Sequence, residues 1–168
     1  MKKSLSPLIL LMTVTACAQQ GGLSDKKQIE NIVQSFVDCI EKKDTTMFLT
    51  LFYEGPVQWM GTMKSASYAS ELKENPEAKD FFAGNQRLFI RSVSGKDNCA
   101  EKFYNIRIHE DGSIAMVVFD YSFWKNGKKE NWGQESWGLI KTEGRWKITS
   151  VIFSIEMENV LPEPRSRN

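Results

Sequence analysis

The chain has 168 residues, which is enough for one domain with a sizeable hydrophobic core. Its 22 basic and 21 acidic side chains nearly cancel, and this balance argues against a nucleic-acid-binding surface and predicts no nucleic-acid partner. The cysteines lack the spacing of zinc ligands and no glycine-rich phosphate loop is present, so we predict neither a metal site nor a cofactor.

The N-terminus has the three-part layout of a secretory signal. Lys2 and Lys3 form a basic head, residues 4–12 form a mostly apolar run, and residues 14–17 end that run with small side chains and a cysteine. The run is too short to span a bilayer. The cysteine after small residues resembles a bacterial lipobox, whose cysteine takes up lipid and becomes the mature N-terminus. The alternative is an ordinary cleaved signal peptide with a cysteine nearby by chance.

The lipobox interpretation fixes the expected organisation of the chain. It predicts a signal peptide at residues 1–16, a lipidated N-terminus and tether at residues 17–23, and a folded domain at residues 24–160. Lipid on Cys17 would make the membrane a partner, because several acyl chains together anchor a protein stably. By resemblance to bacterial lipoproteins, Ala18 favours the outer membrane, facing the periplasm. We therefore expect the protein in the bacterial cell envelope.

The first half of the domain is predicted to be mainly helical. Apolar residues recur at three- and four-residue spacing from Ile29 to Ile40, and Ser24 is a suitable N-cap for that helix. Asp44 is predicted to cap a second, shorter helix that Gly55-Pro56 ends.

The middle of the chain is less regular. A short strand is expected at residues 57–60, followed by one or two helices within residues 65–82 that Pro76 interrupts. Residues 85–100 are ambiguous, because Leu88-Phe89-Ile90 fits either a strand or the buried end of a helix.

The last third is predicted to be an antiparallel meander of four long strands, at residues 103–110, 113–124, 130–141 and 145–156. Turn dipeptides separate these strands: Asp111-Gly112, Asn126-Gly127 and Glu143-Gly144. The first two are strong hairpin signals. Residues 161–168, with two prolines and two arginines, are predicted to form a flexible tail.

Helices followed by a long meander predict an α+β fold: a cone-like curved antiparallel sheet, made of the four-stranded meander plus a short strand, covered by the N-terminal helices. Over residues 25–156 the chain resembles the nuclear transport factor 2-like superfamily, which includes ketosteroid isomerases and SnoaL-like polyketide cyclases. The resemblance rests on the long first helix, the short second helix before a Trp-bearing strand, and the closing hairpin with Gly-Arg-Trp-Lys-Ile at residues 144–148. It implies a pocket between sheet and helices but no particular reaction.

Hairpin arithmetic assigns the meander side chains to two faces, if each turn has two residues and no strand bulges. The more apolar face should lie under the helices and line the pocket. The other face should carry His109, Asp120, Glu135 and Trp137. The predicted ligand-binding residues are Tyr53, Trp59, Tyr104, Phe119, Tyr121, Gln134, Ser136 and Phe153. A bulge would flip the register and turn the charged side chains into the pocket instead.

Three functions fit this pattern. The leading hypothesis is a lipid-anchored envelope domain without catalysis, whose apolar pocket binds a small hydrophobic molecule or is vestigial. The alternative is an acid–base enzyme, such as an isomerase, cyclase or dehydratase, if a carboxylate lies in the pocket. The third is an envelope interaction module or homodimer that uses the outer sheet face, where charges mix with large apolar groups. No residue is assigned a catalytic role.

If Cys17 carries lipid, Cys39 and Cys99 remain in an oxidising compartment. They could form one disulfide or stay as two free thiols.

Overall fold

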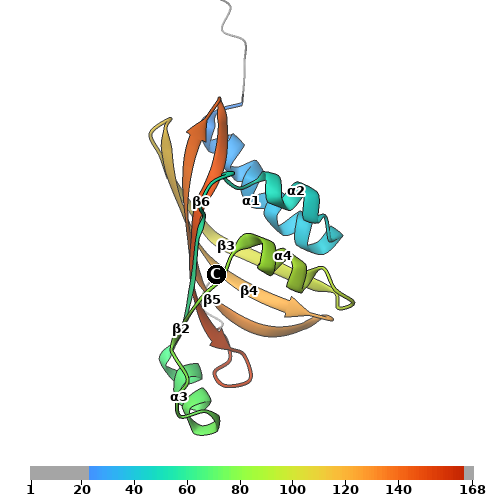
Figure 1. Ribbon diagram of the computed structural model, residues 1–168, viewed down its shortest axis with the longest axis vertical. Helices are drawn as coiled ribbons and strands as arrows, with labels where there is room; N and C mark the ends of the chain where they lie inside the picture. The colour runs from blue at the N-terminus through green and yellow to red at the C-terminus, as the bar shows by residue number, and fades with distance from the viewer. Residues whose placement is uncertain (1–22, 165–168) are drawn as a thin grey trace, which may run out of the picture.

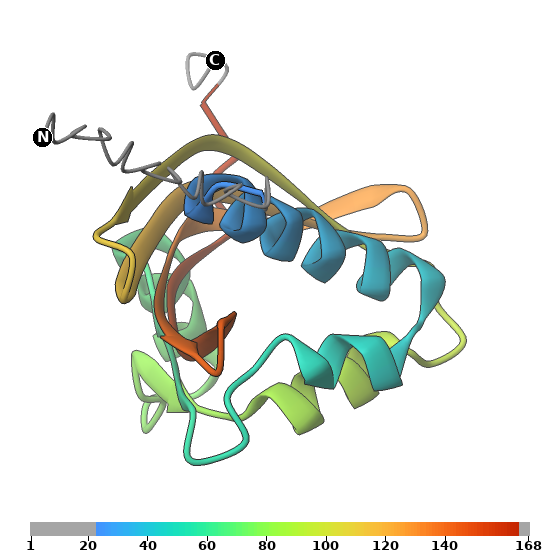
Figure 2. The ribbon, with the colours of Figure 1, turned by 90° about the horizontal axis from the view of Figure 1, so that it is seen from above.

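The computed structural model describes residues 23–164 and shows a curved six-stranded sheet with helices on its concave side (Figures 1 and 2). The predicted signal peptide, the lipid-accepting Cys17 and the last four residues lie outside the described residues. Within residues 23–164, no helix combines the length and the apolar character needed to cross a membrane.

Helix α1 (Asp25–Lys42) forms as the sequence predicts. The Ser24 hydroxyl accepts a hydrogen bond from the Lys27 amide at 3.3 Å, which satisfies one of the free amides at the helix start. The apolar stripe is buried against the sheet, with Ile29 and Phe36 at 0% and 1% exposure. This stripe is what positions α1 over the concave face, so Phe36 reaches the interior from the helix side.

Two shorter helices complete the cover of the concave side. Helix α2 (Thr45–Thr50) is capped by Asp44, as predicted, with its carboxylate 2.8 Å from the Met47 amide. Helix α4 (Gln86–Val93) resolves the ambiguous segment, and its Asn85 cap accepts a hydrogen bond from the Leu88 amide at 2.9 Å. Figure 2 shows the sheet curving around these helices, with α1 on one side and α2 and α4 on the other.

Helix α3 (Ser65–Glu74) lies at the far end of the sheet from α1 and α2 (Figure 1). Its Ser67 amide donates to the Glu156 carboxylate at 2.8 Å. After Pro76 the chain forms strand β2 (Phe81–Ala83) rather than the second helix that the sequence suggested. The reason is long-range, because Phe81–Ala83 pairs with β1, and such pairing overrides local propensity.

The sheet has the order β2-β1-β6-β5-β4-β3. The four meander strands β3 (Cys99–Glu110), β4 (Ile114–Lys125), β5 (Lys128–Thr142) and β6 (Arg145–Met157) confirm the predicted antiparallel meander. Strand β1 (Gln58–Met63) runs parallel to β6, so the sheet is mixed rather than wholly antiparallel.

A bulge in β5 makes the predicted face assignment of this strand wrong. Trp124 pairs with Lys129 as the turn requires, but the next pair is Phe123 with Asn131, which leaves Glu130 as an extra residue. Side chains alternate with a period of two, so one extra residue exchanges the faces of everything beyond it. Glu135 therefore lies opposite Phe119 on the concave face, together with Trp137 and Leu139.

Two further bulges shift the neighbouring strands. In β3 the register shifts between Tyr104 and Arg107, where Asn105 has a φ of 54°, and this turns Tyr104 outward beside Asp120. In β6 Thr149 is the extra residue, and Trp146 and Ile148 beyond it face the core instead of the outer side.

The core is dominated by aromatic packing around Trp137, which is fully buried. Its ring centroid lies 4.8 Å from that of Phe36 and 5.0 Å from that of Phe119. On the outer side, residues 161–163 do not form the loose tail that we predicted. The Leu161 carbonyl accepts a hydrogen bond from the Trp132 indole at 2.9 Å, and Glu163 pairs with Lys129 at 2.7 Å.

Candidate functional site

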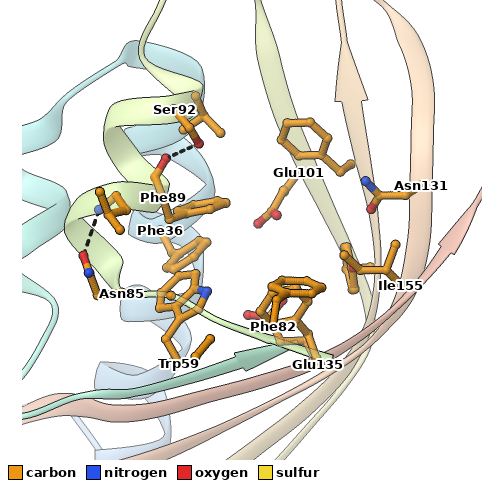
Figure 3. A pocket seen from close by; sticks show the side chains of 17 residues that line it. Phe36, Trp59, Phe82, Asn85, Phe89, Ser92, Glu101, Asn131, Glu135 and Ile155 are labelled. Atoms are coloured by element: carbon orange, nitrogen blue, oxygen red, sulfur yellow. Dashed lines mark hydrogen bonds between the residues drawn. The ribbon is translucent and has the colours of Figure 1, made fainter. Parts of the chain in front are cut away.

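A cavity of about 440 Å³ lies between the concave face of the sheet and helix α4 (Figure 3). This volume is within the range of about 300–1,000 Å³ that is usual for small-molecule sites. Most of the wall is aromatic, and the rings come from α1, α4 and four of the six strands: Phe36, Trp59, Phe82, Phe89, Tyr121, Phe123 and Phe153. Phe82 and Leu88 are 37% and 55% exposed and lie where the cavity meets the surface.

Two carboxyl groups lie in this aromatic surrounding. Glu101 projects from β3 into the cavity with 6% exposure (Figure 3). Its Oε2 is buried and has no hydrogen-bond partner among the described residues. A buried polar atom without a partner costs about 1–3 kcal/mol, so such atoms are rare in folded proteins.

Glu135 reaches the same cavity from β5 with 5% exposure. Its Oε1 accepts a hydrogen bond from the Trp137 indole nitrogen at 2.5 Å. Because Trp137 is fully buried and packed on three sides by other rings, this donor is held in place. The Glu135 carboxyl group is therefore fixed, whereas the Glu101 Oε2 has no such donor among the described residues.

Burial raises the pKa of both carboxyl groups, because the ionised form loses its hydration. The pKa of Glu101 rises well above its usual value, by burial first and by the nearby charge of Glu135 second. The pKa of Glu135 rises to about 7, since burial outweighs the opposing hydrogen bond from Trp137. No lysine, arginine or histidine is among the described residues that line the cavity. Among the described residues the two carboxyl groups thus share a site without a counter-charge, which favours their protonated forms.

Two other polar groups of the wall, the hydroxyls of Tyr121 and Ser92, are already engaged. The Tyr121 hydroxyl donates to the Ser154 carbonyl at 3.0 Å, and burial raises the pKa of this phenol well above its usual value. The Ser92 hydroxyl donates to the Phe89 carbonyl at 2.8 Å. A molecule in the cavity would therefore meet the two carboxyl groups and the Asn131 amide as its polar contacts.

The predicted ligand-binding residues fall into two groups. Trp59, Tyr121 and Phe153 line the cavity. Phe119 faces the same side but is fully buried beneath the wall, with its ring centroid 4.2 Å from that of Phe103.

The remaining predicted residues do not reach the cavity. Tyr53 follows α2 and is 39% exposed. Tyr104, Gln134 and Ser136 lie on the convex face, contrary to the prediction, because the bulges in β3 and β5 turn them outward. Asp120 lies on that face as expected and accepts hydrogen bonds from Asn105 and Gln134 at 2.9 and 3.3 Å.

Sequence reasoning missed Glu101 and placed Glu135 on the outer face unless a bulge flipped the register, although a signal for both carboxyl groups exists. In β5, Glu135, Trp137 and Leu139 alternate with small or polar residues, so the two large apolar side chains mark the buried face and Glu135 shares it. In β3, Glu101 lies between Cys99 and Phe103 with the same period. A glutamate at an inward position of an alternating strand is the pattern to look for.

Other chemistry-bearing groups do not gather elsewhere in the described part of the chain. Between residues 23 and 164, no three His, Cys, Asp or Glu side chains come close enough to hold a metal ion. Cys39 and Cys99 are both buried free thiols, and burial raises the pKa of each. His109 is exposed at the end of β3.

No protein-family model and no curated protein matches the sequence. An NTF2-like protein from Cytophaga hutchinsonii is similar in structure, with a TM-score of 0.58, 12% identity, and coverage of 80% of this chain and 100% of the other. A protein with a cystatin-like fold from Nostoc punctiforme has a TM-score of 0.57 at 12% identity, over 79% and 91% of the two chains.

A third similar structure is described both as NTF2-like and as having a cystatin-like fold. An NTF2-like protein with a cystatin-like fold from Novosphingobium aromaticivorans has a TM-score of 0.56 at 11% identity, over 84% of this chain and 85% of the other. At these identities the likeness concerns the fold and carries no information on ligands. The chain thus has the nuclear transport factor 2-like fold that its sequence resembles, a curved sheet that encloses a pocket with its helices.

Proposed function

We propose that the protein binds a small, mainly apolar molecule in the aromatic cavity, and that Glu101 and Glu135 recognise its polar group. The observation that carries this proposal is the Glu101 Oε2, which is buried in the wall of a cavity of ligand size and has no hydrogen-bond partner within residues 23–164. A ligand donor on that oxygen would remove the cost of leaving it without a hydrogen bond. The aromatic walls provide the apolar contact area typical of ligand sites.

A mutant comparison tests this assignment. A compound is first selected from a library of small apolar molecules by its effect on the melting temperature. We expect Glu101→Gln and Glu135→Gln to weaken its binding at least tenfold, which is about 1.4 kcal/mol. Asp120→Asn is the matched control, because it removes a carboxylate from the opposite face of the same sheet. A loss of affinity in the control, with full affinity in both glutamine variants, would contradict the proposal.

An acid–base enzyme is the second candidate. Its supporting observation is the difference between the two carboxyl groups, since Glu135 accepts a hydrogen bond from the Trp137 indole and has a pKa of about 7, whereas the Glu101 Oε2 has no hydrogen-bond partner among the described residues. A group that titrates near neutral pH can accept and return a proton efficiently. An isomerase, cyclase or dehydratase would use Glu135 as the base and Glu101 as a hydrogen-bond donor. Proton exchange between the selected compound and D2O, followed by NMR, separates this enzyme from a binding protein.

We also propose that lipid on Cys17 anchors the domain in the bacterial envelope, at the outer membrane facing the periplasm. The support is the N-terminal sequence, with its basic head, apolar run and small residues before the cysteine. The tether at residues 17–23 then leads directly to Ser24, which caps α1. A homodimer through the convex sheet face remains a further prediction, supported by the exposed Met116 and Ile152.

The anchor predicts a change of location in one variant. Cys17→Ser should release the protein from the membrane fraction, because the acyl chains would supply the stable attachment. Fractionation of cells with a high-salt wash measures this, and Cys39→Ser serves as the control because that thiol is buried in the domain. A Cys17→Ser protein that stays in the washed membranes would rule out the lipid anchor.

A further inference from the structure

We propose that the molecule bound in the cavity is a small organic cation, a protonated amine with an apolar body, whose charge lies between Glu101 and Glu135. This inference rests on the proposed ligand-binding function and adds the charge of the ligand to it.

The first argument is the unbalanced charge of the cavity. Two carboxyl groups face it, and the described wall residues include no lysine, arginine or histidine. The Trp137 indole donates one hydrogen bond to Glu135, and Glu101 Oε2 has none. Buried charges in proteins are normally paired, because an unpaired one loses its hydration without compensation. A cationic ligand supplies the missing partner, whereas an anion would be repelled.

The second argument is the aromatic wall, which suits an organic cation. The ring centroids of Trp59 and Phe89 are 5.1 Å apart, and those of Phe82 and Phe153 are 5.5 Å apart, so the wall is continuous. A cation within about 6 Å of an aromatic face is attracted by it. A divalent metal ion fits poorly, because calcium and magnesium need about six to eight oxygen ligands, which this wall does not offer.

Cation binding also has a proton signature. In the free protein, burial and the charge of Glu135 both disfavour the ionised form of Glu101. A bound ammonium group favours the ionised form of both carboxyl groups, so the pair would release protons on binding at pH 7. The other titratable group in the wall, Tyr121, stays protonated, because burial and both glutamates raise its pKa. A neutral ligand leaves the protons in place.

The test uses triplets of compounds that share one apolar body and differ in charge. Examples are tryptamine, tryptophol and indole-3-acetate, with the matching phenyl and naphthyl sets for bodies of other sizes. Calorimetric titration of the purified full chain at pH 7 gives the affinity of each compound. In every triplet that binds, we expect the amine to bind at least tenfold more tightly than the alcohol, and the acid most weakly.

Two controls make the result specific. The preference for the amine should vanish in the Glu101→Gln/Glu135→Gln double variant and persist in Asp120→Asn. Repeating the titration in phosphate and Tris, which differ in ionisation enthalpy, should show proton release for the amine and none for the alcohol.

Three outcomes would overturn the inference and leave the proposed function intact. They are an alcohol that binds as tightly as its amine, an acid that binds most tightly, and a set in which no amine binds while the wider library yields a neutral ligand. If that neutral ligand loses affinity in the two glutamine variants, the proposed function holds without the cation. If no compound depends on either glutamate, the proposed function fails as well.

Discussion

Glu101→Gln and Glu135→Gln are each expected to stabilise the domain at pH 8 and to change its stability little at pH 5. Both carboxyl groups have a higher pKa in the folded state than in the unfolded chain. Their contribution to stability is therefore fully present below the unfolded pKa and is lost as the pH rises through the folded pKa. Glutamine is neutral throughout and removes this loss.

The size of the expected stability change follows from the pKa shift of Glu135. The pKa of Glu135 rises from 4.5 to about 7, and at 1.36 kcal/mol per unit this corresponds to roughly 3 kcal/mol of unfolding free energy lost by pH 8. The two carboxyl groups interact, so the effects of the single variants should not add in the double variant.

Urea unfolding at pH 5, 6.5 and 8 measures this dependence. Hydrogen bonds lower the pKa of Asp25, Asp38, Asp97 and Asp111, so these carboxylates stay ionised throughout and contribute little slope between pH 5 and 8. Asp120→Asn is the control and should keep the slope of the parent protein. A parent protein whose stability is flat from pH 5 to 8 would show that the carboxyl groups are not held in a dry cavity.

The elements of this fold follow from local chemistry. Helix α1 has its apolar stripe and its Ser24 cap where the sequence predicts them. Helix α2 likewise begins at the predicted Asp44 cap. The turn at Asn126-Gly127 also forms as expected, with φ of 51° and 79°, because these two residue types tolerate the left-handed region. Caps, apolar periodicity and turn residues act over a few neighbouring residues, so the sequence of those residues is enough to predict the element.

The register beyond each turn could not be predicted. The turn fixes only the first pairs, Lys125 with Lys128 and Trp124 with Lys129, and the bulge at Glu130 then exchanges the faces of β5. Nothing in the composition of residues 128–132 marks that bulge. The parallel pairing of β1 with β6 is equally hidden, because it joins segments about ninety residues apart.

The same limit explains which site residues were found. Trp59, Tyr121 and Phe153 are large aromatic residues, a type that the sequence places on the concave side. The face of Phe153 was predicted correctly because the bulges at Glu130 and Thr149 offset each other. Glu101 and Glu135 violate the rule that charged side chains face water, and a rule-based assignment places them outside. Functional sites are where local rules and the fold disagree, so this disagreement itself supports a role for the two carboxyl groups.

Trp137→Ala is expected to lower the free energy of unfolding by about 3–5 kcal/mol, as truncation of a buried aromatic side chain does. The indole is fully buried and packs against Phe36, Phe103 and Phe119. Trp124→Ala is the control, because Trp124 is only half buried at the end of β4 and should cost less. Equal losses in the two variants, measured by urea unfolding at pH 5, would contradict the central position of Trp137 in the core.

Trp137→Phe separates packing from the hydrogen bond to Glu135. The phenyl ring keeps most of the contacts with Phe36 and Phe119, so the loss of stability at pH 5, where Glu135 is largely protonated, should be well below that of the alanine variant. Above pH 7 the ionised Glu135 would lack its indole donor, which otherwise lowers its pKa. Stability should therefore fall more steeply with pH in Trp137→Phe than in the parent protein, and Glu135→Gln should abolish the difference between them. Equal slopes in the two proteins would mean that the indole N–H does not stabilise the Glu135 charge, and that the carboxyl pair is held by burial alone.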